Sequence, residues 1–336
     1  MKVAVIGGGV LGSLVSLNLV ERGADVTIFD SSVRSNARAS HGYRMAGVFW
    51  QNLALRGLMN ESTDWWKNYL SAYSTNLSIS RDMLEVFPDI ASLESVESIL
   101  KELNVEYERD LSTLFDGPNL NYPNAVHLIN MDLFLEVAND DLYEGGAKFE
   151  SKEIESNKEL VALREDFDFI IVANGSWIGK FHELTGVGVR TTRQNWYQVV
   201  GSVDSEFPYL KDMRNSHRIV PDGNGLRLFN GAVGEEFEPT GVYKEDKQEV
   251  LSLQSYLETW FPGSKSQLVG NSCQYACSPD YLPVLTQAEG ITFLCPPAGG
   301  GVKTGPRLAA ACVRMALDEI SEFPQFDVSR FESTAK

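Results

Sequence analysis

The first thirty residues alternate between apolar runs and a helical stretch. Residues 3–6 are continuously apolar, which is typical of a parallel strand buried on both faces. Residues 10–22 have an apolar helical pattern that ends before Gly23, and residues 25–30 return to a strand pattern. This order predicts a strand–helix–strand unit within a doubly wound parallel sheet.

The pattern changes further along the chain. Residues 190–277 contain alternating polar and apolar positions separated by turn signals such as Pro221-Asp222-Gly223, which predict an antiparallel sheet. Helices are also expected at residues 59–101, 130–147 and 303–320, and buried strands at 167–173 and 291–294. The expected fold class is α/β, with a Rossmann-like domain of parallel strands and helices interleaved with an α+β domain on a mainly antiparallel sheet.

Charge and cysteine content narrow the function classes. The chain of 336 residues has 46 acidic and 29 basic side chains, and its formal charge of −17 disfavours nucleic acid and membrane surfaces as partners. Any anionic substrate must therefore be held by local cations. The four cysteines form no Cys-x-x-Cys pair, so neither a disulfide framework nor a metal site is expected, and the protein is predicted to be cytoplasmic.

A dinucleotide fingerprint lies between the first predicted strand and helix. Gly7, Gly9 and Gly12 have the spacing that permits a tight turn, close approach of a pyrophosphate and packing of helix on strand. Asp30 ends the second strand, where a carboxylate accepts hydrogen bonds from an adenosine ribose. The fingerprint alone does not separate FAD from NAD, but the chain continues with a helical, aromatic stretch, and this favours FAD.

A glycine loop precedes the last predicted helix. Gly299, Gly300 and Gly301 would expose backbone amides at a helix start, which can stabilise negative charge on the pyrimidine edge of a reduced flavin. Thr304 is expected to cap this helix and Pro306 to lie in its first turn.

Four segments resemble the D-amino-acid oxidase superfamily of FAD-dependent oxidoreductases, and within it the branch of monomeric sarcosine oxidase and amino-acid oxidases. They are the fingerprint with residues 39–44, residues 169–177, residues 273–280 and residues 299–304. The resemblance implies a discontinuous FAD-binding domain at 1–75, 125–189 and 278–336, and a substrate domain at 76–124 and 190–277. It also implies FAD contacts at Ser40, His41, Gly42, Arg44, Gly175, Trp177, Val302 and Lys303.

The same resemblance suggests roles for individual side chains. Lys303 matches a lysine that helps to bind the substrate carboxylate, and Cys273 matches a cysteine joined covalently to the flavin, with noncovalent FAD or attachment at Cys277 as alternatives. Arg227 stands where the branch has a lysine that promotes reaction of reduced flavin with oxygen. Arg44 and His41 are expected beside the flavin.

Some features of the substrate site are left open by the sequence. Trp50, Trp196 and Tyr197 are expected to be core residues, with aromatic walls around a substrate amine as the alternative. A second cation for the carboxylate is not identified, because residues 45–50 lack the arginine that the branch carries there.

The predicted function is FAD-dependent oxidation of a carbon–nitrogen bond in a small-molecule amine or amino acid to an imine. Reoxidation would be by oxygen or another acceptor. The alternatives are an amino-acid dehydrogenase with a non-oxygen acceptor, a flavoprotein subunit of a larger assembly with a redox partner or oligomer, an NAD-dependent dehydrogenase and a flavin hydroxylase. The hydroxylases would be expected to have a Gly-Asp pair before the last helix, where this chain has residues 298–301 as Ala-Gly-Gly-Gly.

Overall fold

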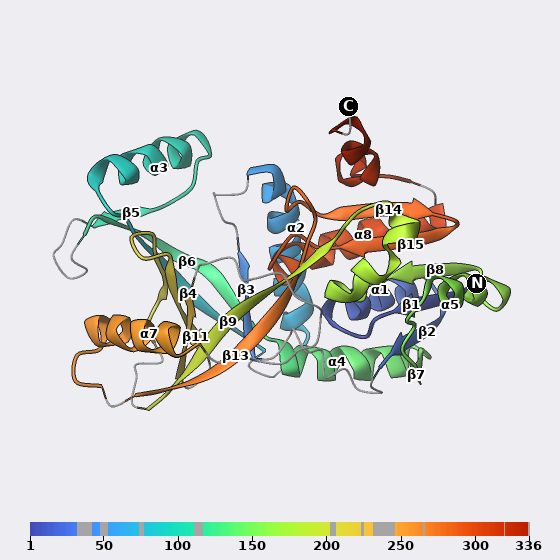
Figure 1. The fold of residues 1–336 in the computed structure, drawn as a ribbon, viewed down its shortest axis with the longest axis horizontal. Helices are drawn as coiled ribbons and strands as arrows, with labels where there is room; N and C mark the ends of the chain where they lie inside the picture. Colours follow the sequence, from blue (N-terminus) through green and yellow to red (C-terminus); the bar gives the residue numbers. More distant parts are fainter. Residues whose placement is uncertain are drawn as a thin grey trace.

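Two sheets organise the molecule into two lobes (Figure 1). The computed structural model describes residues 1–31, 42–47, 53–73, 77–110, 117–201, 206–222, 225–230, 246–264, 266–318 and 320–334. The long strands β9 (Arg190–Val200) and β13 (Gln267–Cys277) run from one lobe toward the other. A parallel sheet with helices beside a mainly antiparallel sheet confirms the fold class predicted from the sequence.

The first sheet has six strands in the order β14-β15-β8-β1-β2-β7. They are β1 (Lys2–Ile6), β2 (Asp25–Asp30), β7 (Lys148–Ser151), β8 (Phe169–Val172), β14 (Val284–Ala288) and β15 (Ile291–Cys295). All neighbours pair in parallel except β14 and β15. Because β1 lies inside the sheet, both of its faces are covered: Val3 and Val5 join one apolar cluster, while Ala4 and Ile6 join another.

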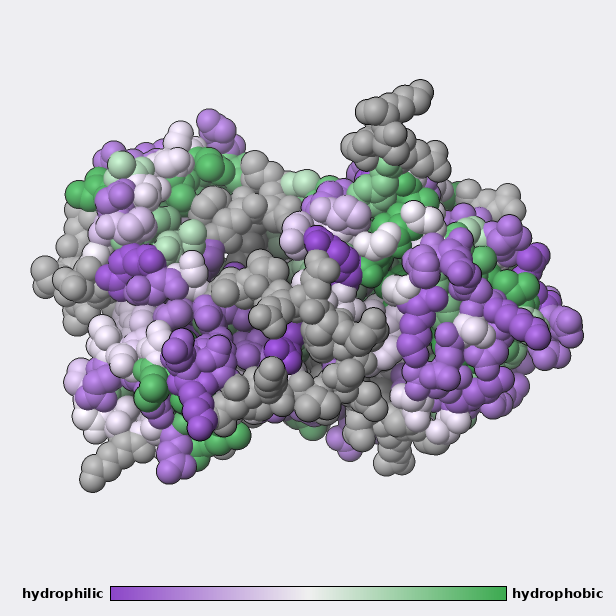
Figure 2. Space-filling view, in the orientation of Figure 1, coloured by the Kyte–Doolittle hydropathy of each residue, from purple (hydrophilic) through white to green (hydrophobic). Residues whose placement is uncertain are grey.

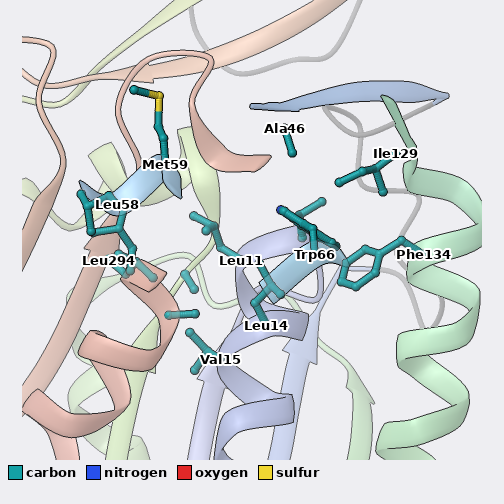
Figure 3. Packing of buried hydrophobic residues seen from close by; sticks show 14 of the residues in the cluster. Leu11, Leu14, Val15, Ala46, Leu58, Met59, Trp66, Ile129, Phe134 and Leu294 are labelled. Carbon is teal, nitrogen blue, oxygen red and sulfur yellow. The ribbon is translucent and has the colours of Figure 1, made fainter. Parts of the chain in front are cut away.

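Helices cover both faces of this sheet. The longer ones are α1 (Val10–Glu21), α2 (Arg56–Ser71), α4 (Met131–Glu144) and α8 (Gly301–Asp318). Figure 3 shows Leu11, Leu14 and Val15 of α1 in the shared core with Trp66 of α2 and Phe134 of α4. The short elements are η1 (Leu53–Leu55), α5 (Asn157–Ala162), η3 (Leu163–Glu165), η4 (Gly175–Phe181), α6 (His182–Thr185), η5 (Pro324–Phe326) and η6 (Val328–Thr334).

The second sheet has the strand order β13-β9-β12-β11-β10-β4-β6-β3, and β5 also pairs with β6. Its further strands are β3 (Tyr43–Gly47), β4 (Ser78–Val86), β5 (Glu108–Asp110), β6 (Asn119–Asn130), β10 (Tyr209–Asp212), β11 (His217–Asp222) and β12 (Gly225–Asn230). Only β10 and β4 pair in parallel. Helix α7 (Lys247–Trp260) packs on one face of this sheet, and α3 (Ile90–Glu102) lies near its outer end (Figure 1).

The helix predicted over residues 59–101 is wrong in its middle part. Two helices, α2 and α3, are separated there by the strand β4. The side chains of β4 alternate, because Leu84 and Val86 pack against α7 while Met83 joins the core on the opposite face. Pairing with β6 and β10 stabilises this strand, and neither partner is adjacent to it in the sequence.

The division of the chain between the lobes stays a prediction in its details. Strand β3 belongs to the second sheet although it lies within the predicted segment 1–75, and β6 crosses residue 125. Figure 2 shows a face covered largely by hydrophilic side chains with scattered apolar ones, as expected for a chain of charge −17. No helix in the described ranges is both long enough and apolar enough to cross a bilayer.

Candidate cofactor and substrate site

The fingerprint turn requires glycine for steric reasons. The Gly7 N–H donates to the Phe29 carbonyl at 2.8 Å, and the residue has a φ of +107°. A Cβ atom on Gly7 would lie 2.8 Å from the Ala173 carbonyl oxygen, and one on Gly12 would lie 1.7 Å from the Gly7 carbonyl oxygen. The first turn of α1 begins at Gly9 without a side-chain cap, so its backbone amides are available for an anion.

One cavity is lined by segments that are distant in the sequence. Asp30 lines one end, where its Oδ2 accepts a hydrogen bond from the Gly8 N–H at 2.7 Å. The glycine loop before α8 lines the other end. The predicted cofactor residues that line this cavity are Gly7, Gly9, Asp30, Arg44, Gly175, Trp177, Gly299, Gly301 and Val302.

Other predicted residues lie behind or beside the cavity. Gly12 packs under the fingerprint turn, and a Cβ on Gly300 would lie 2.5 Å from Pro297 Cγ. Gly42 lies against the Arg227 guanidinium, since a Cβ there would be 1.5 Å from Nη2. Ser40, His41 and Trp50 are outside the described residues.

Several cavity residues were missed by the sequence analysis. Lys152, Glu153 and Ile154 line the Asp30 end because β7 pairs in parallel with β2, with Ser151 opposite Asp30. Gln274 and Tyr275 of β13 line the other end. The pairing of strands that are distant in the sequence leaves no local sequence signal. The only available signal was that ligands bind at the carboxyl ends of parallel strands.

The start of α8 differs from the prediction. The helix begins at Gly301, so Thr304 lies inside it and donates from Oγ1 to the Gly300 carbonyl at 3.0 Å instead of capping the end. Pro306 is in the second turn of α8. A proline has no N–H to donate to the helix, and the tertiary structure supplies other hydrogen-bond partners there. Gly299 has a φ of +63° and packs against the Tyr275 ring, where a Cβ would come within 3.1 Å.

Two arginines meet one cysteine and one indole beside the cavity. Arg44 donates from Nη2 to Cys273 Sγ at 3.3 Å. Arg227 is buried, bonds Asp222 Oδ2 at 2.7 Å and stacks 4.2 Å above the Trp196 ring. Burial and the nearby Arg44 charge lower the pKa of Arg227, which Asp222 partly offsets.

Two of the residues considered from the sequence, Tyr197 and Cys277, have their hydrogen-bond partners outside the cavity. Tyr197 faces α7 and donates its hydroxyl to Glu249 Oε2 at 2.6 Å, so it belongs to the core and not to a wall around the amine. Successive strand residues face opposite sides, so Trp196 instead faces the arginines. Cys277 Sγ lies 3.3 Å from Thr192 Oγ1, and neither Cys273 nor Cys277 is among the residues that line the cavity.

The glycines and the polar groups that line the cavity fit an FAD. Its glycines leave room for a pyrophosphate close to the backbone, and a Cβ at Gly7 would close that space. The Gln274 side-chain amide is buried at 4% exposure, and neither its nitrogen nor its oxygen has a hydrogen-bond partner in the described part of the chain. The Asn174 Oδ1 is also buried without one. Because buried polar groups are normally paired, a ligand with donors and acceptors is expected here.

Lys303 lies in the first turn of α8 and is not among the residues that line the cavity. Burial, followed by the charges of Arg218 and Lys211, lowers the pKa of Lys303 to about 7. Arg218 was not singled out from the sequence. The described residues contain no cluster of His, Cys, Asp and Glu that could hold a metal ion.

Comparisons with known proteins are consistent with this geometry. A family model described as FAD dependent oxidoreductase matches residues 2–315. Iminodiacetate oxidase from Chelativorans sp. BNC1 is a similar structure, with 17% identity, a TM-score of 0.77 and coverage of 97% of this chain and 98% of that one.

Two further structures are similar to this chain. L-proline dehydrogenase from P. horikoshii has 16% identity and a TM-score of 0.79, with coverage of 99% and 98% of the two chains. Glycine oxidase from Bacillus cereus ATCC 14579 has 16% identity and a TM-score of 0.78, with coverage of 98% of both chains. No curated protein sequence matches this chain. At these identities the structural likeness shows the fold.

Proposed function

The chain belongs to the family of FAD dependent oxidoreductases, and from this premise we propose that it oxidises a carbon–nitrogen bond of an amine or amino acid to an imine. The resemblance noted in the sequence is thereby confirmed at the level of the family. The observation that carries the proposal is the cavity that is lined by both the fingerprint turn and the glycine loop, with Arg44 of the second sheet also in its lining. Three similar structures are named for enzymes of iminodiacetate, L-proline and glycine, which are all amino acids.

Backbone groups would hold most of the cofactor. We assign the amides at the start of α1 to the pyrophosphate and the Asp30 carboxylate to the adenosine ribose. The start of α8, from Gly299 to Lys303, would face the pyrimidine edge of the flavin and stabilise negative charge there. Gly42, Gly175, Trp177 and Val302 complete this proposed set, together with Ser40 and His41.

FAD supplies the acceptor for the hydride equivalent that leaves the carbon next to the nitrogen. The protein's own residues would bind the uncharged amine, orient it and exclude water, so no dedicated general base is required. We propose that Lys303 attracts the substrate carboxylate, and that Arg44, Arg227 and His41 act beside the reacting ring. Trp196 would form part of the wall around the amine.

The structure supports two finer proposals about the flavin. Cys273 would be the attachment point if the FAD is covalent, because its Sγ accepts a hydrogen bond from Arg44, which lines the cavity. Arg227 would provide the positive charge that favours oxygen as acceptor, but its guanidinium spreads that charge and is already paired with Asp222. A dehydrogenase that passes electrons to another acceptor or partner is therefore retained as the second candidate.

The test is spectroscopic. We expect the purified protein to show the visible spectrum of oxidised flavin, and anaerobic addition of glycine, L-proline or iminodiacetate to bleach it. Admission of air should restore the colour if oxygen is the acceptor, and an artificial electron acceptor should restore it in either case. Protein that is colourless and takes up no added FAD would overturn the proposal.

A further inference from the structure

Four oxidisable aromatic side chains lie in contact along helix α2 and the turn that follows it. Trp65 and Trp66 pack edge to face, with ring centroids 5.1 Å apart. Tyr69 stacks on Trp65 at 4.7 Å with an interplanar angle of 10°, and the Tyr73 ring lies 5.2 Å from the Tyr69 ring. Side chains four residues apart are neighbours on a helix, so Trp65 and Tyr69 share one side of α2. The four rings form an unbroken path.

One end of this path reaches the cavity. Trp66 is 1% exposed, and its indole N–H donates at 2.8 Å to the carbonyl of Val302, which lines the cavity beside the glycine loop. The indole is therefore one hydrogen bond away from the wall of the proposed flavin site. Because electron transfer falls off steeply with distance, a ring in this position is a favoured electron donor to an oxidant in the cavity.

The other end of the path reaches a carboxylate. The hydroxyls of Tyr69 and Tyr73 both donate to Oδ2 of Asp141 in α4, the first at 2.7 Å. Burial, followed by the hydrogen bond to Asp141, raises the pKa of both phenols, so they are protonated in the resting protein. Tyr73 and Asp141 are both partly exposed. The path therefore ends near solvent, on a group that can accept a proton.

The hydrogen-bond partners differ in a way that favours transfer in one direction. An oxidised indole is positively charged, and the Val302 carbonyl cannot remove its proton, so the charge on Trp66 is relieved by an electron from the next ring. An oxidised phenol is a strong acid, and Asp141 is already bonded to both hydroxyls. Packing of the rings alone does not require two hydroxyls to share one carboxylate oxygen.

We propose that these four side chains carry electrons from the protein surface to a strong one-electron oxidant in the cavity, either a photoexcited flavin or an oxygen-centred radical. An electron leaves Trp66 for the oxidant, and an electron from Trp65 replaces it. A tyrosine then reduces Trp65: its O–H bond breaks, the proton passes to Asp141 Oδ2, and a neutral tyrosyl radical remains. A soluble thiol can return a hydrogen atom to the tyrosyl oxygen, and Asp141 releases its proton to water. This inference requires bound flavin but not amine oxidation.

Flash photolysis of the FAD-loaded protein tests the path, because blue light converts bound oxidised flavin into a strong one-electron oxidant. We expect transient absorption to show a tryptophan radical followed by a tyrosyl radical. Electron paramagnetic resonance of samples frozen under illumination, with ferricyanide added to take electrons from the flavin, should show the same tyrosyl radical. Its formation should be slower in deuterated water, because a proton moves with the electron.

Two variants interrupt the path at different steps. Trp65→Phe replaces an oxidisable ring with an inert one, so the tyrosyl signal should be lost while the Trp66 radical still forms. Asp141→Asn keeps an oxygen for the two hydroxyls but cannot take a proton, so the tyrosyl signal should again be lost. Tyr275 lines the cavity itself, and a radical formed there would survive both changes.

Two controls separate the path from general effects on the protein. Trp260→Phe makes the same change in α7, where Trp260 packs on Phe207 away from the path, and it should keep the wild-type tyrosyl signal. Phe134→Leu removes an inert ring that packs on both Trp66 and Tyr69, so it tests the effect of packing alone (Figure 3). It should also keep the signal.

The absence of a tyrosyl radical in the wild-type protein would overturn the proposal. A signal that persists in Trp65→Phe or Asp141→Asn, or an equal loss in either control, would do so as well. Circular dichroism checks that each variant is folded, and Asp141→Asn carries the test if Trp65→Phe is not. Radical formation in a protein that oxidises no amine would refute the proposed function alone.

Discussion

The indole N–H of Trp66 donates a hydrogen bond to the main-chain carbonyl of Val302, at a distance of 2.8 Å. In a regular helix that carbonyl would accept from residue 306, which is a proline and has no N–H. One residue later, the Arg307 N–H donates to Ser62 Oγ at 3.2 Å. Helix α2 thus repairs the break in α8 next to the glycine loop, and it fixes Val302 where the cavity ends.

Trp66→Phe should destabilise the protein by about 1–3 kcal/mol, because the Val302 carbonyl loses its donor in a largely buried position. The loss should shrink in the background of Pro306→Ala, since an alanine N–H can bond the Val302 carbonyl within the helix. Urea unfolding of the two single variants and the double variant measures this coupling. Trp65→Phe is the control, because Trp65 stacks on Tyr69 without a hydrogen bond to α8. Equal costs in both backgrounds would contradict the assignment.

Gly12→Ala should prevent FAD binding and lower the stability by about 1–3 kcal/mol. The new Cβ would stand 1.7 Å from the Gly7 carbonyl oxygen, so the fingerprint turn must move. Gly57→Ala in α2 adds the same methyl group where no atom lies within 4 Å, and it should be neutral or stabilise by up to about 1 kcal/mol. The ratio of flavin to protein absorbance, together with urea unfolding, separates the two outcomes.

Cys273→Ser should remove flavin colour from acid-precipitated protein if the wild-type pellet is yellow. The Cys273 sulfur accepts a hydrogen bond from Arg44, which lines the cavity, whereas Cys277 is turned to Thr192. Cys277→Ser should therefore keep the colour. A yellow Cys273→Ser pellet would exclude this attachment point, and a colourless wild-type pellet would indicate noncovalent FAD.

Binding of acetate, which carries a carboxylate but no amine, should weaken as the pH rises through about 7 if Lys303 attracts the substrate carboxylate. The free protein loses the Lys303 proton near that pH, and a bound carboxylate favours the protonated form, so its pKa is higher in the complex. Affinity should be constant well below pH 7 and fall by up to tenfold per pH unit above it. Titrations between pH 6 and 9 measure this slope. Lys303→Arg should abolish it, because arginine stays protonated; an unchanged slope would assign the effect to another group.

Arg227→Met should slow the reaction of reduced flavin with oxygen, by at least about tenfold, because it removes a positive charge that stabilises superoxide. Arg227→Lys keeps the charge and should retain the reaction. Stopped-flow mixing of the dithionite-reduced protein with oxygenated buffer gives both rates. Loss of the Asp222 partner also predicts lower stability for Arg227→Met, so the comparison requires folded protein. Equal rates in all three proteins would remove Arg227 from the oxygen reaction.

Much of the fold follows from local patterns. The buried run of β1, the glycine turn and the apolar α1 are adjacent in the chain, and their steric requirements do not depend on distant partners. The alternating stretches of the second sheet were likewise visible. Strand β4 was not, because only pairing with β6 and β10 separates its short apolar run from the helical spacing on either side.

The sequence by itself determined the dinucleotide turn and the glycine loop, because each rests on residues close together in the chain. Only the tertiary structure decided which side chains share the site. Arg44 and Cys273 are 229 residues apart, and the charge of Arg218 in the second sheet lowers the pKa of Lys303 in α8. The face on which a strand residue lies depends on what packs against the sheet, and so Trp196 turns to the site while Tyr197 turns to α7.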